Sequence, residues 1–158
     1  MRRALLPAVV LGGCICATAS AWTPQKQLGS PIFTFAGGKI TCIIQKAEKN
    51  PTAVTYIRCD GKLVGGDRAA IAKTEAQCEA SAKKYGYDSG VGGLALKPTG
   101  PGEVNCISDA LGGPYKTMPA GATLTNGPFT CSMAAAGLTC STKGGHGFVF
   151  GASSWRVY

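Results

Sequence analysis

Short apolar or β-branched stretches recur along the chain, and polar or glycine-rich segments separate them. This pattern is typical of β-strands. Where a turn signal joins two such stretches, as Asn50-Pro51 does, it predicts a hairpin. The pattern predicts hairpins from 40–44 with 54–59, from 129–133 with 138–141 and from 147–150 with 155–158, and further strands at 31–35, 94–96 and 104–107.

One segment has the pattern of a helix. Asp67 can cap a helix over Arg68–Tyr85, and Gly86 follows its last residue. Spacings of seven, four and three residues, which return to one side of a helix, predict its buried face: Ile71, Cys78, Ala82 and Tyr85. The predicted fold class is therefore mainly β, a small antiparallel sheet or barrel of disulfide-stapled hairpins with one helix near 68–85.

Glycine and proline mark the connections between these elements. The chain has 23 Gly and 9 Pro in 158 residues, without a collagen-like period. Residues 87–103 and 109–127 are especially rich in turn residues, and we expect loops there apart from the strand at 94–96. A length of 158 residues fits one domain with its own core.

The first 21 residues have the pattern of a signal peptide. Arg2 and Arg3 precede the apolar run Leu5–Ala17, and Ala19-Ser20-Ala21 is a small-residue cleavage site. This predicts a signal peptide at 1–21, a flexible leader at 22–30 and a single secreted domain at 31–158. The alternative is lipidation of Cys14 in Leu11-Gly12-Gly13-Cys14, which would anchor the protein to a membrane at the cell envelope.

Six cysteines remain after cleavage at Ala21, and six allow fifteen pairings. Two predicted hairpins carry one cysteine in each arm. This favours Cys42–Cys59, Cys131–Cys140 and, for the remaining two, Cys78–Cys106. The alternative is a metal site at Cys131, Cys140 and His146. Because residues 22–158 contain no C-x-x-C, the sequence favours disulfides, and we expect no metal.

Charge limits the classes of partner. The net charge is +8, and it is +6 without Arg2 and Arg3. The basic residues are scattered, so we expect no nucleic-acid partner. Lys83-Lys84-Tyr85 mixes basic and aromatic residues and is a candidate functional loop. The alternative, which we favour, is a helix end where the cations suit the helix dipole.

Catalytic patterns are sparse. His146, the single histidine, lies in Gly144-Gly145-His146-Gly147 and is either a general base on a loop or a residue tolerated in a turn. The sequence has no serine elbow, P-loop or dinucleotide fingerprint. We therefore assign no catalytic residue and no cofactor, and we expect a protein that is not an enzyme.

Several motifs carry a resemblance. They are Gly38-Lys39-Ile40-Thr41-Cys42, Arg58-Cys59-Asp60, Cys106-Ile107-Ser108-Asp109, Phe129-Thr130-Cys131, Gly137-Leu138-Thr139-Cys140 and Gly145-His146-Gly147-Phe148. Over about residues 32–158 the chain resembles a family of small secreted, disulfide-containing bacterial proteins, mostly actinobacterial, classed as a domain of unknown function. The resemblance implies secretion and the same order of disulfides, and it implies no activity.

Three functions fit the sequence. The first is a secreted or cell-envelope binding protein whose partner is a cell-wall polymer or a secreted protein. The second is an inhibitor of a secreted hydrolase, a protease rather than a lysozyme, acting through a loop such as 115–119. The third is a small hydrolase that uses His146.

Overall fold

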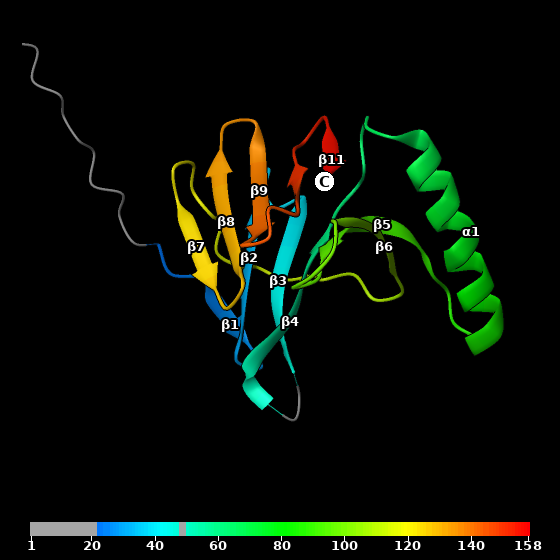
Figure 1. The fold of residues 1–158 in the computed structure, drawn as a ribbon, viewed down its shortest axis with the longest axis horizontal. Coiled ribbons are helices and arrows are strands. Elements are labelled where there is room, and N and C mark those ends of the chain that lie inside the picture. Colours follow the sequence, from blue (N-terminus) through cyan, green and yellow to red (C-terminus); the bar gives the residue numbers. More distant parts are fainter. Residues whose placement is uncertain (1–21, 48–49) are drawn as a thin grey trace, which may run out of the picture.

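The computed structural model describes residues 22–47 and 50–158, so the predicted signal peptide and Cys14 lie outside the described residues. The chain forms two antiparallel sheets and one helix (Figure 1). The first sheet contains, in chain order, β1 (Gln25–Gln27), β2 (Ser30–Phe35), β3 (Ile40–Ala47), β4 (Asn50–Asp60), β5 (Gly90–Leu96) and β6 (Glu103–Ile107). The second contains β7 (Thr123–Asn126), β8 (Phe129–Ala134), β9 (Gly137–Thr142), β10 (Gly147–Phe150) and β11 (Trp155–Val157).

The two sheets pack face to face and share one core. The alternation of β8 places Phe129, Cys131 and Met133 inside and leaves Ser132 outside. The first sheet contributes apolar side chains from its four central strands to the same cluster, among them Phe33, Cys42, Ile57 and Leu94. The mainly β fold is thus confirmed as a two-layer arrangement, and over the described residues the sheets do not close into a barrel.

The three disulfides pair as predicted, two from the hairpins and the third by elimination: Cys42–Cys59, Cys131–Cys140 and Cys78–Cys106. The first and third join residues that face each other directly across neighbouring strands, with Cα atoms 4.0 and 4.1 Å apart. Both lie fully buried in the core between the sheets. The Cys78–Cys106 bridge instead ties the helix to β6 at the edge of the first sheet.

Helix α1 (Arg68–Tyr85) begins and ends as predicted. The Asp67 carboxylate accepts hydrogen bonds from the backbone N–H groups of Ala69 and Ala70, and Gly86 ends the helix in the left-handed conformation, at φ 71°. The helix packs against β5 and β6, beside the second sheet (Figure 1). Among the described residues no helix is long and apolar enough to cross a membrane.

The predicted buried face of α1 is partly wrong. Thr74 and Cys78 are its buried residues, Ile71 and Ala82 are half-buried, and Tyr85 is 63% exposed. The face is narrower than the spacing suggested because the helix overhangs the sheet edge and its C-terminal turn extends beyond β6. Tyr85 is therefore not a core residue.

Two segments expected to be irregular contain strands. Residues 22–30 include β1, whose three exposed residues pair with β2, and Trp22 packs edge-on against Phe33 with ring centroids 5.7 Å apart. The predicted loop 109–127 includes β7, which pairs with β8. In both cases the partner strand supplies the order, because neither segment has a strong apolar alternation of its own.

Candidate functional site

The residues proposed from the sequence lie in separate elements. Lys83, Lys84 and Tyr85 form the last turn of α1, which contacts the first sheet, whereas His146 lies in the turn between β9 and β10 of the second sheet. The six cysteines are all in disulfides and offer no thiolate. Within the described residues no group of three His, Cys, Asp or Glu side chains could hold a metal ion.

The backbone of His146 stabilises the turn between β9 and β10. Its carbonyl oxygen accepts hydrogen bonds from the Thr142 N–H at 2.8 Å and from Thr142 Oγ1 at 3.4 Å. No described side chain forms a hydrogen bond with the imidazole, so nothing orients the ring as a base needs to be oriented. This geometry supports the interpretation of His146 as a turn residue.

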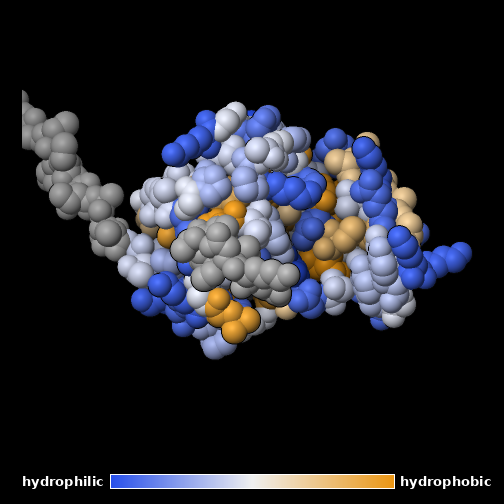
Figure 2. Space-filling view, turned by 60° about the horizontal axis from the view of Figure 1, so that its bottom comes forward, coloured by the Kyte–Doolittle hydropathy of each residue, from blue (hydrophilic) through white to orange (hydrophobic). Residues whose placement is uncertain are grey.

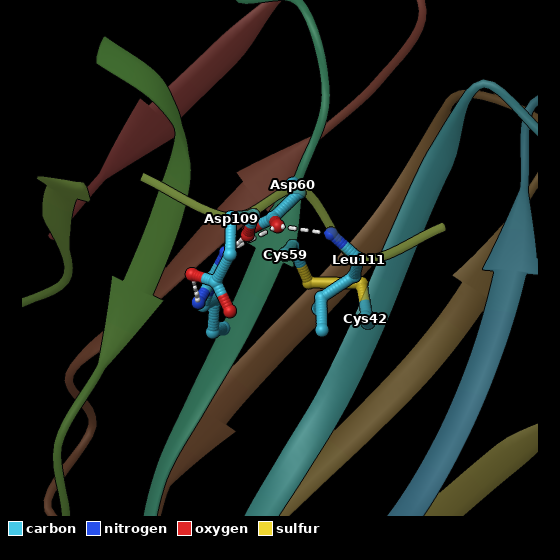
Figure 3. Close-up of polar contacts among 6 residues, drawn as sticks. Cys42, Cys59, Asp60, Asp109 and Leu111 are labelled. Atoms are coloured by element: carbon cyan, nitrogen blue, oxygen red, sulfur yellow. Dashed lines mark hydrogen bonds and ion pairs between the residues drawn. A yellow bond between two sulfur atoms is a disulfide. The ribbon is translucent and has the colours of Figure 1, made fainter. Parts of the chain in front are cut away.

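A denser polar cluster lies on the outer face of the first sheet, opposite the core. Arg58 donates to both carboxylate oxygens of Asp60, from Nε and Nη2 at 2.7 Å each. It also donates from Nη1 to the Asp109 carboxylate at 3.2 Å and from Nη2 to the Asp109 carbonyl oxygen. Asp60 accepts a further hydrogen bond from the Leu111 N–H at 2.9 Å (Figure 3).

The cluster fixes a loop on the sheet. The Asp60 side chain is 5% exposed and the Arg58 side chain 13%, so both charged groups are largely shielded from water. Each would be an uncompensated buried charge without its ion-pair partner. Asp109 and Leu111 come 51 residues later in the chain and are held by the same pair. The Cys42–Cys59 disulfide supports the strands directly beneath, on the core side (Figure 3).

Arg58 stays charged in this position. Burial alone lowers its pKa, but the hydrogen bonds and charges of Asp60, followed by those of Asp109, outweigh burial, and the pKa is raised from its ordinary value. The guanidinium is therefore a permanent, oriented donor. Three of its nitrogens are already paired with the two aspartates, so the cluster as a whole presents little free positive charge.

Two hollows flank this cluster along the outer face, and together we call them the outer groove. The first has a volume of about 300 Å³ and is lined by Tyr56, Arg58, Ala95, Lys97, Glu103, Asn105 and Cys106. The second, of about 430 Å³, lies between the sheet and the fixed loop and is lined mainly by Lys39, Thr41, Asp60, Val91, Ile107 and Leu111.

The charges in the first hollow are also paired. Lys97 Nζ lies 2.8 Å from a Glu103 carboxylate oxygen, and both side chains are exposed. The first hollow therefore offers the Tyr56 ring, the Asn105 amide and locally neutralised charges rather than a field of one sign. Such a lining can form hydrogen bonds in both directions with an uncharged polar ligand.

The sequence analysis did not find this cluster, although a signal exists. Residues two apart on a strand point to the same face, so Arg58 and Asp60 had to share a face while Cys59 pointed into the core. The contributions of Asp109 and Leu111 had no local signal, because they depend on how a distant loop folds back.

Comparison with family models, with curated proteins and with solved structures found no match for this chain. The resemblance to a family of secreted bacterial proteins accordingly stays a prediction. The three disulfides are the feature of the structure that bears on the compartment, since such bridges form and persist in oxidising environments.

Proposed function

We propose that this protein is a secreted or cell-envelope binding protein that holds an uncharged stretch of a cell-wall glycan in the outer groove. The observation that carries the proposal is the position of Arg58, which is fixed by four hydrogen bonds between two hollows on the outer face of the first sheet. A binding surface built on rigid strands needs little ordering when the ligand arrives.

The lining of the groove favours a glycan over a charged polymer. Sugar hydroxyls both donate and accept hydrogen bonds, and the paired Lys97 and Glu103 and the Asn105 amide offer both kinds of group. The half-buried Tyr56 offers an aromatic surface with a polar tip. An anionic polymer such as a nucleic acid would instead favour free lysines and arginines in both hollows, whereas Lys39 and Lys62 line only the second.

The inhibitor hypothesis is less well supported. Residues 115–119 are held against β2: Met118 is buried, the Thr34 N–H donates to the Lys116 carbonyl, and the Met118 N–H donates to the Thr34 carbonyl. The backbone groups of Lys116 and Met118 that pair with Thr34 are therefore not free to bind a protease. The hydrolase hypothesis has no oriented base at His146, as described above.

A sedimentation assay with purified peptidoglycan tests the proposal. We expect the domain at 22–158 to bind, and the double variant Tyr56→Ser/Asn105→Ala to bind about 30-fold more weakly, because two contacts of about 1 kcal/mol each are removed. Because the charges in the first hollow are paired, binding should persist when the salt concentration is raised about tenfold to about 0.5 M.

The matched control is Thr125→Ala, an exposed strand residue on the outer face of the second sheet. It should bind as the parent does. The proposal fails if the parent does not bind, if high salt abolishes binding, or if the groove variant and the control behave alike.

A further inference from the structure

The second hollow of the outer groove differs from the first in its charge. Its lining includes Lys39 and Lys62, which are both exposed, and neither forms an ion pair within residues 22–47 and 50–158. In the first hollow, by contrast, Lys97 is paired with Glu103, and Arg58 is paired with two aspartates. Lysines without an acidic partner therefore line only one of the two hollows.

The register of β3 and β4 places these two lysines together. It pairs Thr41 with Asp60 where the two strands leave the ladder, and Lys39 and Lys62 each lie two residues beyond that pair. The chains stay adjacent there, because a Cβ on the intervening Gly61 would lie 2.8 Å from the first side chain of β3. The two ammonium groups therefore come from neighbouring segments and face one hollow.

The acidic residue of the second hollow does not neutralise the lysines. Asp60 lines the hollow, but its two carboxylate oxygens accept hydrogen bonds from Arg58 at 2.7 Å each, and one of them also accepts from the Leu111 N–H. The charge of Asp60 is thus already balanced by Arg58. Two lysines beside a balanced ion pair leave a net positive charge, which attracts an anion.

The rest of the second hollow is largely apolar. Val91, Ile107 and Leu111 line it and are half-buried. Ile107 lies directly against the backbone of Gly92, and the hydrogen bond of the Leu111 N–H to Asp60 holds Leu111 over the strands (Figure 3). The volume of about 430 Å³ has room for more than a single ion. The hollow therefore offers aliphatic contacts next to positive charge.

We propose that the second hollow binds a carboxylate that the glycan carries on a short aliphatic substituent. The ammonium groups of Lys39 and Lys62 bind the carboxylate oxygens, and the carbon atoms of the substituent pack on Ile107 and Leu111. A phosphate group matches the charge but has no aliphatic part for these apolar side chains. Since the uncharged part of the same strand lies in the first hollow, this assignment rests on the proposed function.

Purified peptidoglycan in two chemical forms tests the proposal. Both are stripped of phosphate-containing polymers; one keeps its carboxylates, and in the other they are converted to neutral amides. The domain at 22–158 should bind the carboxylate form about tenfold more tightly, because each of two exposed charge pairs contributes modestly. About 0.5 M salt should remove this preference and leave binding of the amidated form unchanged.

Lys39→Gln/Lys62→Gln isolates the contribution of the second hollow. This variant should bind the carboxylate form about tenfold more weakly than the parent, and it should bind the amidated form as the parent does. Both side chains are exposed and outside the ion pairs, so its stability in denaturant should match that of the parent. Lys39→Arg/Lys62→Arg keeps both charges and should keep the preference.

Two lysines of α1 supply a matched control. Lys83 and Lys84 are exposed, form no ion pair with another described residue and line neither hollow. Figure 2 shows hydrophilic side chains projecting into solvent on the helix side of the molecule, at the right. Lys83→Gln/Lys84→Gln removes the same charge as the hollow variant and should prefer the carboxylate form as strongly as the parent does.

The proposal is overturned if the parent binds both forms equally, or if the hollow variant and the control lose the same amount. Wall material that retains its phosphate-containing polymers provides a third comparison. Tighter binding to this material than to the carboxylate form, lost in Lys39→Gln/Lys62→Gln, would assign the hollow to phosphate and overturn the carboxylate. If the parent binds neither form of peptidoglycan, the proposed function fails as well, whereas equal binding to both forms contradicts only the role of the second hollow.

Discussion

The two sheets share one core but have different outer faces. The first carries a largely buried ion cluster and two hollows, and the cluster joins Arg58 to a loop 51 residues further along the chain. The second carries short hydroxyl side chains from three neighbouring strands: Thr123, Thr125, Thr130, Ser132, Thr139 and Ser141. Two pairs of these hydroxyls approach to 3.3 Å, Thr123 with Ser132 and Thr125 with Thr130.

This difference shows which outer face has only the residues that folding requires. A half-buried antiparallel sheet needs polar residues such as threonine outside and apolar residues inside. The outer face of the second sheet fits this pattern, with short hydroxyl side chains on three neighbouring strands. The first sheet withdraws Arg58 and Asp60 from water, which stabilises a fold little compared with apolar packing. An arrangement that folding does not require points to the first sheet as the place of function.

The largest expected losses of stability come from removing disulfides. The Cys78–Cys106 bridge spans 28 residues and holds α1 on the first sheet, whereas Cys131–Cys140 spans 9 residues within the second. Loop entropy predicts that Cys78→Ala/Cys106→Ala loses about 4 kcal/mol of unfolding free energy, and Cys131→Ala/Cys140→Ala about 3 kcal/mol. Because Tyr85 is exposed, loss of its packing does not add to this difference between the two variants.

Urea denaturation of both double variants measures the gap. Helical circular dichroism should fall before the tertiary signal in the Cys78/Cys106 variant, because only the docking of α1 is released. A larger loss from the Cys131/Cys140 variant would mean that the second sheet, rather than the link between helix and first sheet, limits the stability of the domain.

A smaller effect separates the two outer faces. Asp60→Ala removes the bidentate carboxylate partner of the Arg58 guanidinium and the acceptor of the Leu111 N–H. We therefore expect the free energy of unfolding to fall by about 3 kcal/mol. Asp109→Ala should cost only about 0.5 kcal/mol, because that carboxylate is exposed and its backbone carbonyl still accepts from Arg58.

Chemical denaturation at pH 7 compares these variants with Ser132→Ala on the second sheet, which should change stability by less than about 0.5 kcal/mol. If Asp60→Ala costs no more than that control, Arg58 turns freely into water and the ion cluster does not organise the outer groove.

The sequence predicted the parts of the fold whose signals are local. The β8–β9 hairpin follows from strict alternation around Cys131 and Cys140, and α1 follows from Asp67 and Gly86 at its ends. The cysteine pairs then follow, because directly opposed residues of a hairpin are close enough to be bridged.

The rest depends on contacts between distant segments. β1 consists of three exposed polar residues and is a strand only because β2 is beside it. Tyr85 has the spacing of a buried residue but extends past the sheet edge. The partners of Arg58 come from a loop whose course no local pattern fixes, so the outer groove was invisible before the fold was known.

The smallest expected effect comes from the hydroxyls of the second sheet. In Thr125→Val/Thr130→Val both partners of a cross-strand pair become apolar groups of nearly the same shape, so no unsatisfied donor remains. Valine also suits a strand at least as well as threonine. We expect the free energy of unfolding to change by less than about 0.5 kcal/mol, and peptidoglycan binding to stay at the parental level. Denaturation and the sedimentation assay check this, and a clear loss of binding would move a binding site to the second sheet and undo the contrast between the two faces.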